Sequence, residues 1–163
     1  MSIRIAQKED IPKIVVMYDQ SRSTMRKNGN MHQWINGYPN QYTAQQDIEK
    51  GNSFIVERDG IAVGTFSLIL GIEPTYNNIY EGQWIDTERP YGTIHRLASL
   101  TQYHGIASEC IKWCYQRTHN IRIDTHRDNT IMQHILEKEG FLRCGIIYLQ
   151  NGDERIAYQK CLK

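Results

Sequence analysis

The chain of 163 residues suits one domain built on a single core, and we expect that domain to span residues 1–163. Its 19 Lys and Arg residues balance 18 Asp and Glu residues to a formal charge of +1, with no basic stripe, which argues against nucleic-acid binding. Residues 1–16 lack the features of a secretory leader, and no apolar run approaches the roughly eighteen residues of a membrane span, so we expect a cytoplasmic protein that enters no membrane.

The amino-terminal part of the chain predicts one strand and two helices. Alternating apolar and polar residues indicate a strand over residues 2–7. A helix follows, with Asp10 as its N-cap, Pro12 in its first turn and Gly29 at its end. After an aromatic, turn-rich link, a shorter helix is expected over residues 44–50.

The next segment contains the clearest hairpin in the sequence. Two β-branched and aromatic runs, residues 53–58 and 61–70, flank an Asp-Gly pair that favours a tight turn. Residues 71–92 follow without a strong period, and a third strand is expected over residues 93–100.

The second half of the chain alternates helices with strands. We expect helices over residues 106–117 and 129–139, a strand over residues 121–126, and two final strands over residues 141–149 and 154–162. This order predicts an α/β (α+β) fold with a single mixed, mostly antiparallel sheet flanked by helices.

The four cysteines lie in apolar surroundings. In a cytosolic chain such residues are most simply small buried side chains with free thiols. The C-x-x-x-C spacing of Cys110 and Cys114 is a poor one for zinc, so we expect no metal site.

The junction of strand, loop and helix near Gly105 has the features of an anion site. The first turn of a helix leaves several backbone N–H groups without intrahelical partners, and the helix dipole adds positive potential there. Gly105 would let an anion approach the backbone without a Cβ in the way. The segment has neither a Walker lysine nor G-x-G-x-x-G, which disfavours nucleoside triphosphates and dinucleotides. The alternative is an ordinary loop.

Two short motifs follow one another between Ile94 and Phe141. A pattern Q/R-x-x-G-x-G/A runs from Gln102 to Ala107 after a strand, and an N…EKxGF pattern is matched by Asn129 and Glu137–Phe141. In these motifs, their spacing and the order of elements, the chain resembles the GCN5-related N-acetyltransferase (GNAT) family. The resemblance implies a GNAT-like sheet whose two central strands splay apart, and acetyl-CoA as the acyl donor.

The resemblance also implies how acetyl-CoA would bind between the strands TIHRLAS and IRIDT. Its pantetheine arm would pair with a strand edge, its diphosphate would lie on loop amides, and Asn129 would hydrogen-bond the pantetheine side. The implied cofactor-binding residues are Leu97, Ala98, Ser99, Gln102, Tyr103, His104, Gly105, Ile106, Ala107 and Asn129.

One position departs from the family pattern. Many members carry a tyrosine four residues before the glycine of the GF pair, where it can protonate the leaving thiolate, and here that position is Leu136. His134 on the same helix, Tyr103 or Tyr148, or water alone are the open alternatives.

The general base and the acceptor pocket are less well marked. His95 on the central strand is the preferred base, and Glu81 and Glu88 are further candidates. Aromatic residues of the two irregular segments either pack loops onto the sheet or line the pocket. The candidates for the pocket wall are Trp34, Tyr38 and Trp84.

We therefore expect an N-acetyltransferase that moves an acetyl group from acetyl-CoA to a primary amine of a small molecule or peptide by direct attack. The alternative is a non-catalytic acyl-CoA-binding or protein-interaction module on the same fold, which Leu136 favours. A third reading is a sheet-based interaction domain without a cofactor. The resemblance also admits a homodimer, for which the sequence offers no support.

Overall fold

The computed structural model describes residues 1–162, and its helices and strands follow the predicted order, with ends that differ by a few residues. The strands are β1 (Ser2–Ile5), β2 (Ser53–Arg58), β3 (Ile61–Leu70), β4 (Gly92–Ser99), β5 (Asn120–Thr125), β6 (Leu142–Tyr148) and β7 (Glu154–Cys161). The α-helices are α1 (Ile11–Lys27), α2 (Gln41–Glu49), α3 (Ile106–Thr118) and α4 (Thr130–Lys138), with short 3₁₀ turns η1 (Lys8–Asp10) and η2 (Pro74–Tyr76).

The strands form one sheet in the order β1-β2-β3-β4-β5-β7-β6. The pairs β1–β2, β2–β3, β5–β7 and β6–β7 are antiparallel, whereas β4 and β5 are parallel. The predicted α/β fold with a mixed, mostly antiparallel sheet is therefore confirmed. The parallel ladder pairs Gly92 with Ile121 and Thr93 with Arg122. The divergence of β4 from β5 beyond it stays a prediction.

The chain divides into two compact units. The first unit contains residues 1–68 and 95–110, and the second contains residues 69–94 and the chain from Ile111 on. Strands β3 and β4 and helix α3 each contribute residues to both units. The description of one domain over the whole chain stays a prediction.

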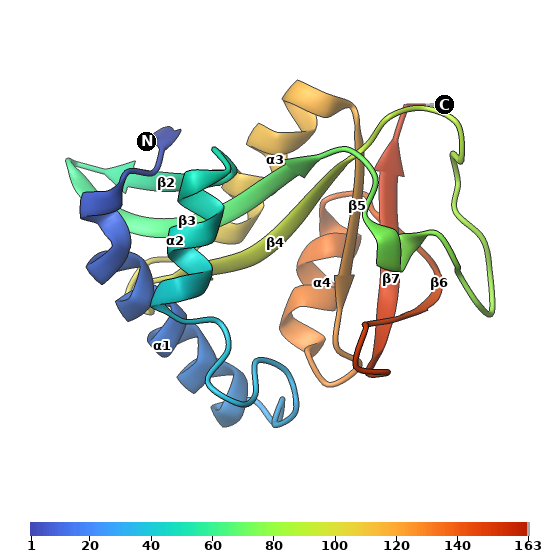
Figure 1. Ribbon diagram of the computed structural model, residues 1–163, viewed down its shortest axis with the longest axis horizontal. Coiled ribbons are helices and arrows are strands. Elements are labelled where there is room, and N and C mark those ends of the chain that lie inside the picture. Colours follow the sequence, from blue (N-terminus) through green and yellow to red (C-terminus); the bar gives the residue numbers. More distant parts are fainter. Residues whose placement is uncertain (163) are drawn as a thin grey trace. The chain divides into compact units, whose positions relative to one another are not determined.

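The first unit is built on the β2–β3 hairpin. Asp59 and Gly60 both have positive φ, 51° and 75°, as the predicted tight turn requires. Helices α1 and α2 lie beside these strands (Figure 1). One cluster of buried apolar residues joins the helices to the strands: Ala6, Ile14, Met17, Tyr18, Trp34, Ala44, Ile55, Ala62 and Ala98.

Asp10 stands at the N-cap of α1, but its side chain makes no capping bond to the helix. The carboxylate instead accepts two hydrogen bonds from Arg4, at 2.8 and 2.9 Å, and one from the Gln7 N–H at 2.7 Å. The predicted N-cap position of Asp10 is therefore confirmed. Its carboxylate does not cap the helix, however, but joins β1 to the start of the helix.

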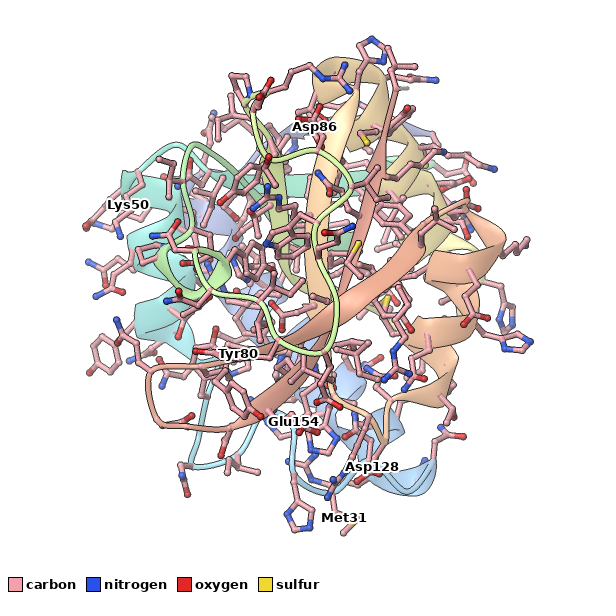
Figure 2. All side chains as sticks on the ribbon, turned by 90° about the vertical axis from the view of Figure 1, so that its right-hand side faces the viewer. Met31, Lys50, Tyr80, Asp86, Asp128 and Glu154 are labelled. Atoms are coloured by element: carbon pink, nitrogen blue, oxygen red, sulfur yellow. The ribbon has the colours of Figure 1, made fainter. Side chains whose placement is uncertain are left out.

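The second unit is built on β5, β7 and β6, covered by the irregular segment 71–91. The Trp84 indole donates to the Tyr76 carbonyl at 2.9 Å, and Tyr80 exchanges two backbone hydrogen bonds with Ile146 at 2.7 and 2.8 Å. Figure 2 labels Tyr80 and Asp86 on this segment. A buried cluster holds it in place: Tyr76, Trp84, Tyr91, Cys144, Ile147 and Ala157.

The cysteines are free thiols, as predicted, and Cys110, Cys114 and Cys144 are buried. Across residues 1–162, no helix combines the length and apolar character needed to cross a membrane.

We predict that Asp10 makes the fold sensitive to acid. Its hydrogen bonds with Arg4 hold the pKa of the Asp10 carboxyl below its usual value of 3.8, so the stabilisation is complete above about pH 4 and is lost as the pH falls through the lowered pKa. Asp10→Asn should therefore lose less free energy of unfolding between pH 7 and pH 3 than the wild type. Urea titrations at both pH values measure this, and equal losses would contradict it.

Candidate active site

Helix α3 begins directly after Gly105, whose φ is +77°. The Glu109 N–H donates to the Gly105 carbonyl at 3.2 Å, so the N–H groups of Ile106, Ala107 and Ser108 precede this helical bond and point out of the helix end. A Cβ placed on Gly105 would meet no heavy atom of residues 1–162 within 4 Å apart from those of Gly105 and its two chain neighbours. The corner therefore presents main-chain donors beside an open approach, as an anion site requires.

Arg58 of β2 holds this corner in place. One guanidinium nitrogen donates to the His104 carbonyl at 3.1 Å and to the Glu109 carboxylate at 3.0 Å. The first contact fixes the loop just before Gly105. The second places a positive charge against the acidic residue in the first turn of α3, which reduces its repulsion of an incoming anion.

Side chains of α1 hold the end of β4. The Ser99 N–H donates to the Ser21 hydroxyl at 3.0 Å, and that hydroxyl donates to the Ser99 carbonyl at 3.3 Å. The Thr101 N–H donates to the Gln20 side chain at 2.9 Å. Both main-chain groups of Ser99 are thus engaged, so they compete with the predicted pairing of a pantetheine arm. We expect that arm to pair with Leu97 and Ala98 rather than Ser99.

His95 lies on β4 and is half-buried. Burial and, to a smaller extent, the neighbouring Arg96 guanidinium lower its pKa to about 4, against an opposing effect of Asp47. The imidazole is therefore neutral at pH 7 and keeps one acceptor nitrogen. Its pKa is far below the value near the working pH that suits a general base.

The loop between α1 and α2, which carries two predicted pocket residues, is held by arginines of α1. Arg26 donates to three carbonyls of this loop at 2.8–3.0 Å, and Arg22 donates to a fourth at 2.7 Å. Trp34 is buried edge-on against Tyr18, with ring centroids 5.9 Å apart, whereas Tyr38 is 42% exposed. A pocket role for Trp34 or Tyr38 stays a prediction.

The other predicted site residues lie in the second unit. The Asn129 side chain caps α4 by accepting from the Met132 N–H at 3.1 Å. His134 is exposed on that helix, and Leu136 is fully buried. Trp84 is buried beneath the Arg122 guanidinium, 4.2 Å from its ring centroid. The first unit thus brings together His95, the end of β4 and the loop before α3. The second unit contains Asn129, His134, Leu136 and Trp84.

A cavity of about 250 Å³ opens on the second unit. Its lining is neutral and mixes tyrosine rings with amide and hydroxyl groups: Pro74, Thr75, Asn78, Tyr80, Tyr148 and Gln150. The rings of Tyr80 and Tyr148 meet edge-on with centroids 5.4 Å apart, and both are partly exposed. Tyr148, one alternative for the thiolate acid, is therefore accessible to solvent.

No sequence pattern signals the hydrogen bond between Tyr76 and Asp124. The Tyr76 hydroxyl donates to the Asp124 carboxylate at 2.6 Å, and burial raises the pKa of both groups. The two residues are 48 positions apart, too far for a local pattern to connect them. The available sign was a carboxylate between the β-branched residues Ile123 and Thr125 of the predicted strand.

Solved structures resemble this chain over almost its full length. A GNAT-family acetyltransferase from Streptococcus agalactiae has a TM-score of 0.92 and 34% identity, covering 99% of this chain and 95% of that one. A GNAT-family acetyltransferase from Listeria monocytogenes has a TM-score of 0.71 and 21% identity, covering 99% and 94%. The NatC complex bound to Gag peptide and CoA has a TM-score of 0.61 and 14% identity, covering 99% and 98%. The last two likenesses show the fold alone.

A scan of protein-family models and a search of curated proteins gave no match.

We predict that His95 titrates near pH 4 rather than near 6.5. Because folding lowers the pKa of His95, the unfolded chain binds more protons between these values, and the free energy of unfolding should fall as the pH drops from about 6.5 to about 4. An NMR titration of the imidazole, assigned with His95→Gln, measures the midpoint. A midpoint near 6.5 would show that burial does not control this group.

Proposed function

Because this chain belongs to the GNAT family of acetyltransferases, we propose that it transfers an acetyl group from acetyl-CoA to a primary amine of a small molecule or peptide. The observation that carries the proposal is the open corner at Gly105, where main-chain N–H groups face outward at the start of α3. Family membership supports acyl transfer, and this corner supports a diphosphate-bearing donor.

The residues of the corner suit a CoA diphosphate. The N–H groups from Gly105 to Ser108 would donate to it. The Tyr103 N–H is not among these donors, because it already donates to the Leu100 carbonyl at 3.2 Å. Arg58 would keep this loop in shape and offset the charge of Glu109. Leu97 and Ala98 would pair with the pantetheine arm, and a role for Asn129 in binding acetyl-CoA stays a prediction.

Acetyl-CoA supplies a thioester whose acetyl carbon the amine attacks, forming an amide and releasing the CoA thiol. The amine must first lose a proton, and we propose the neutral imidazole of His95 or a water molecule as its acceptor. Glu81 and Glu88 stay open as alternatives, joined by Asp124, whose raised pKa makes it a stronger base than an ordinary carboxylate.

The residue that protonates the thiolate stays open as well. Leu136 is buried and apolar, so it supplies no proton. His134 and Tyr148 are accessible to solvent and Tyr103 is half-buried, so each remains a proposal beside water. On the acceptor side, we propose Trp34 and Tyr38 as wall residues, with Tyr38 offering the more exposed surface, whereas a wall role for Trp84 stays a prediction.

Leu136 also supports a second candidate function, in which the protein binds acetyl-CoA without turning it over. The two functions predict different products. An enzyme should release free CoA thiol when acetyl-CoA is mixed with a panel of small and peptide amines, whereas a binding module should be stabilised by acetyl-CoA and release none. At a hundredfold excess over Kd, the stabilisation would be about 2.7 kcal/mol.

We predict that Gly105→Glu weakens acetyl-CoA binding at least about tenfold, because a carboxylate in the anion site repels the diphosphate and Glu disfavours the left-handed conformation. Isothermal titration calorimetry measures the affinity. Gly51→Glu is the matched control, since Gly51 has a similar φ of +74° and open space around its Cα, and lies after α2. Equal affinity in the two variants would contradict the placement of the diphosphate.

A further inference from the structure

Arg96 adopts a left-handed backbone conformation inside a strand. Its φ is +53°, between His95 and Leu97 on β4. Residues other than glycine rarely adopt this backbone conformation, because their Cβ crowds the following carbonyl. Such a residue persists only where its surroundings hold it in place.

The side chain of Arg96 is held by Asp47 of α2. Its Nε and Nη2 atoms donate to the two carboxylate oxygens, each at 2.7 Å, and the Ser67 hydroxyl of β3 donates to the same carboxylate at 2.7 Å. The side chains are only 13% and 8% exposed for Arg96 and Asp47. A two-pronged contact of this kind fixes the direction of the guanidinium and restrains the backbone that carries it.

The same guanidinium also reaches the loop between α1 and α2. Its remaining nitrogen, Nη1, donates to the Tyr38 hydroxyl at 3.0 Å. Tyr38 stands on the loop that Arg22 and Arg26 hold through its carbonyls. One side chain therefore links β4, α2 and this loop within the first unit.

We propose that Arg96, held by Asp47, is a positioning residue for acetyl transfer. It keeps the left-handed turn of β4 that sets the direction of the Leu97–Ala98 edge, and it holds the Tyr38 hydroxyl at the acceptor side. The inference rests on the proposed function, because it assigns acetyl-CoA to that edge and the amine to the Tyr38 side.

A purely structural role is the competing explanation. Replacing one member of a buried ion pair costs stability wherever the pair lies, so stability alone does not separate the two. The chain offers a comparison pair in Arg4 of β1 and Asp10 of η1, which is also two-pronged, through Nη1 and Nη2 of Arg4. Its carboxylate side chain is 10% exposed and its arginine side chain 38% exposed. Asp10→Asn is therefore the control for Asp47→Asn.

The experiment compares Asp47→Asn with Asp10→Asn in the full chain, measuring acetyl-CoA affinity by calorimetry and kcat and KM with the best amine of the panel. We expect both variants to lower Tm. Asp47→Asn should also reduce kcat about tenfold to a hundredfold, because small displacements of reacting groups have effects of this size. Asp10→Asn should stay within about twofold of wild type in kcat and affinity.

Two further comparisons test separately the left-handed backbone of Arg96 and its hydrogen bond to the Tyr38 hydroxyl. In the Asp47→Asn background, Arg96→Gly should bind acetyl-CoA several-fold more tightly than Arg96→Ala, because glycine adopts the left-handed turn without a Cβ. Tyr38→Phe should raise KM for the amine about threefold to tenfold and leave acetyl-CoA affinity unchanged, since it removes one hydrogen bond.

Equal kinetics for Asp47→Asn and Asp10→Asn would overturn the positioning role while the proposed function stands. Equal acetyl-CoA affinity of the two double variants, with Arg96→Gly and with Arg96→Ala, would overturn the backbone part, and an unchanged amine KM in Tyr38→Phe would overturn the acceptor part. If the wild type neither binds acetyl-CoA nor releases thiol, the proposed function fails, and this inference fails with it.

Discussion

The main-chain N–H groups at the start of α3 are the feature on which the proposed site depends. A helix cannot satisfy the donors of its own first turn, and the glycine before Ile106 leaves the approach to them open. Arg58 keeps the preceding loop in place and offsets the charge of Glu109. Backbone donors need no particular side chain, which explains how the bulky residues Tyr103 and His104 can stand in this loop.

Arginines hold the irregular parts of the first unit. Arg22 and Arg26 bind carbonyls of the loop after α1, Arg58 binds the loop before α3, and Arg96 connects β4 to Tyr38. A guanidinium carries five donors in a fixed plane, so one side chain can satisfy several carbonyls that have no partner in a helix or strand. In the second unit, the Gln159 amide holds the segment 71–91 in a similar way, since its Nε2 donates to the Asp86 carbonyl at 3.2 Å and its Oε1 accepts from the Ile85 N–H at 2.8 Å.

The groups available for proton transfer are poorly suited to the proposed chemistry. Burial makes His95 a weak base, and an apolar residue occupies the position where many family members have an acidic tyrosine. Burial has the opposite effect on Asp124, because removing a carboxylate from water favours its protonated form. The same physical cause thus lowers the basicity of the imidazole and raises that of the carboxylate, and the environment of each group matters more than its residue type.

The sequence by itself determined the order of strands and helices, because hydrophobic periodicity and turn residues such as Asp59 and Gly60 act over short distances along the chain. It also located the corner at Gly105, since a glycine directly before an apolar helical repeat is a local feature. Only the tertiary structure decided that Asp10 pairs with Arg4, that Ser21 engages Ser99, and that Arg96 reaches Asp47, 49 positions away. Burial and partners of this kind arise when distant segments pack together, so no local pattern of residues could predict them.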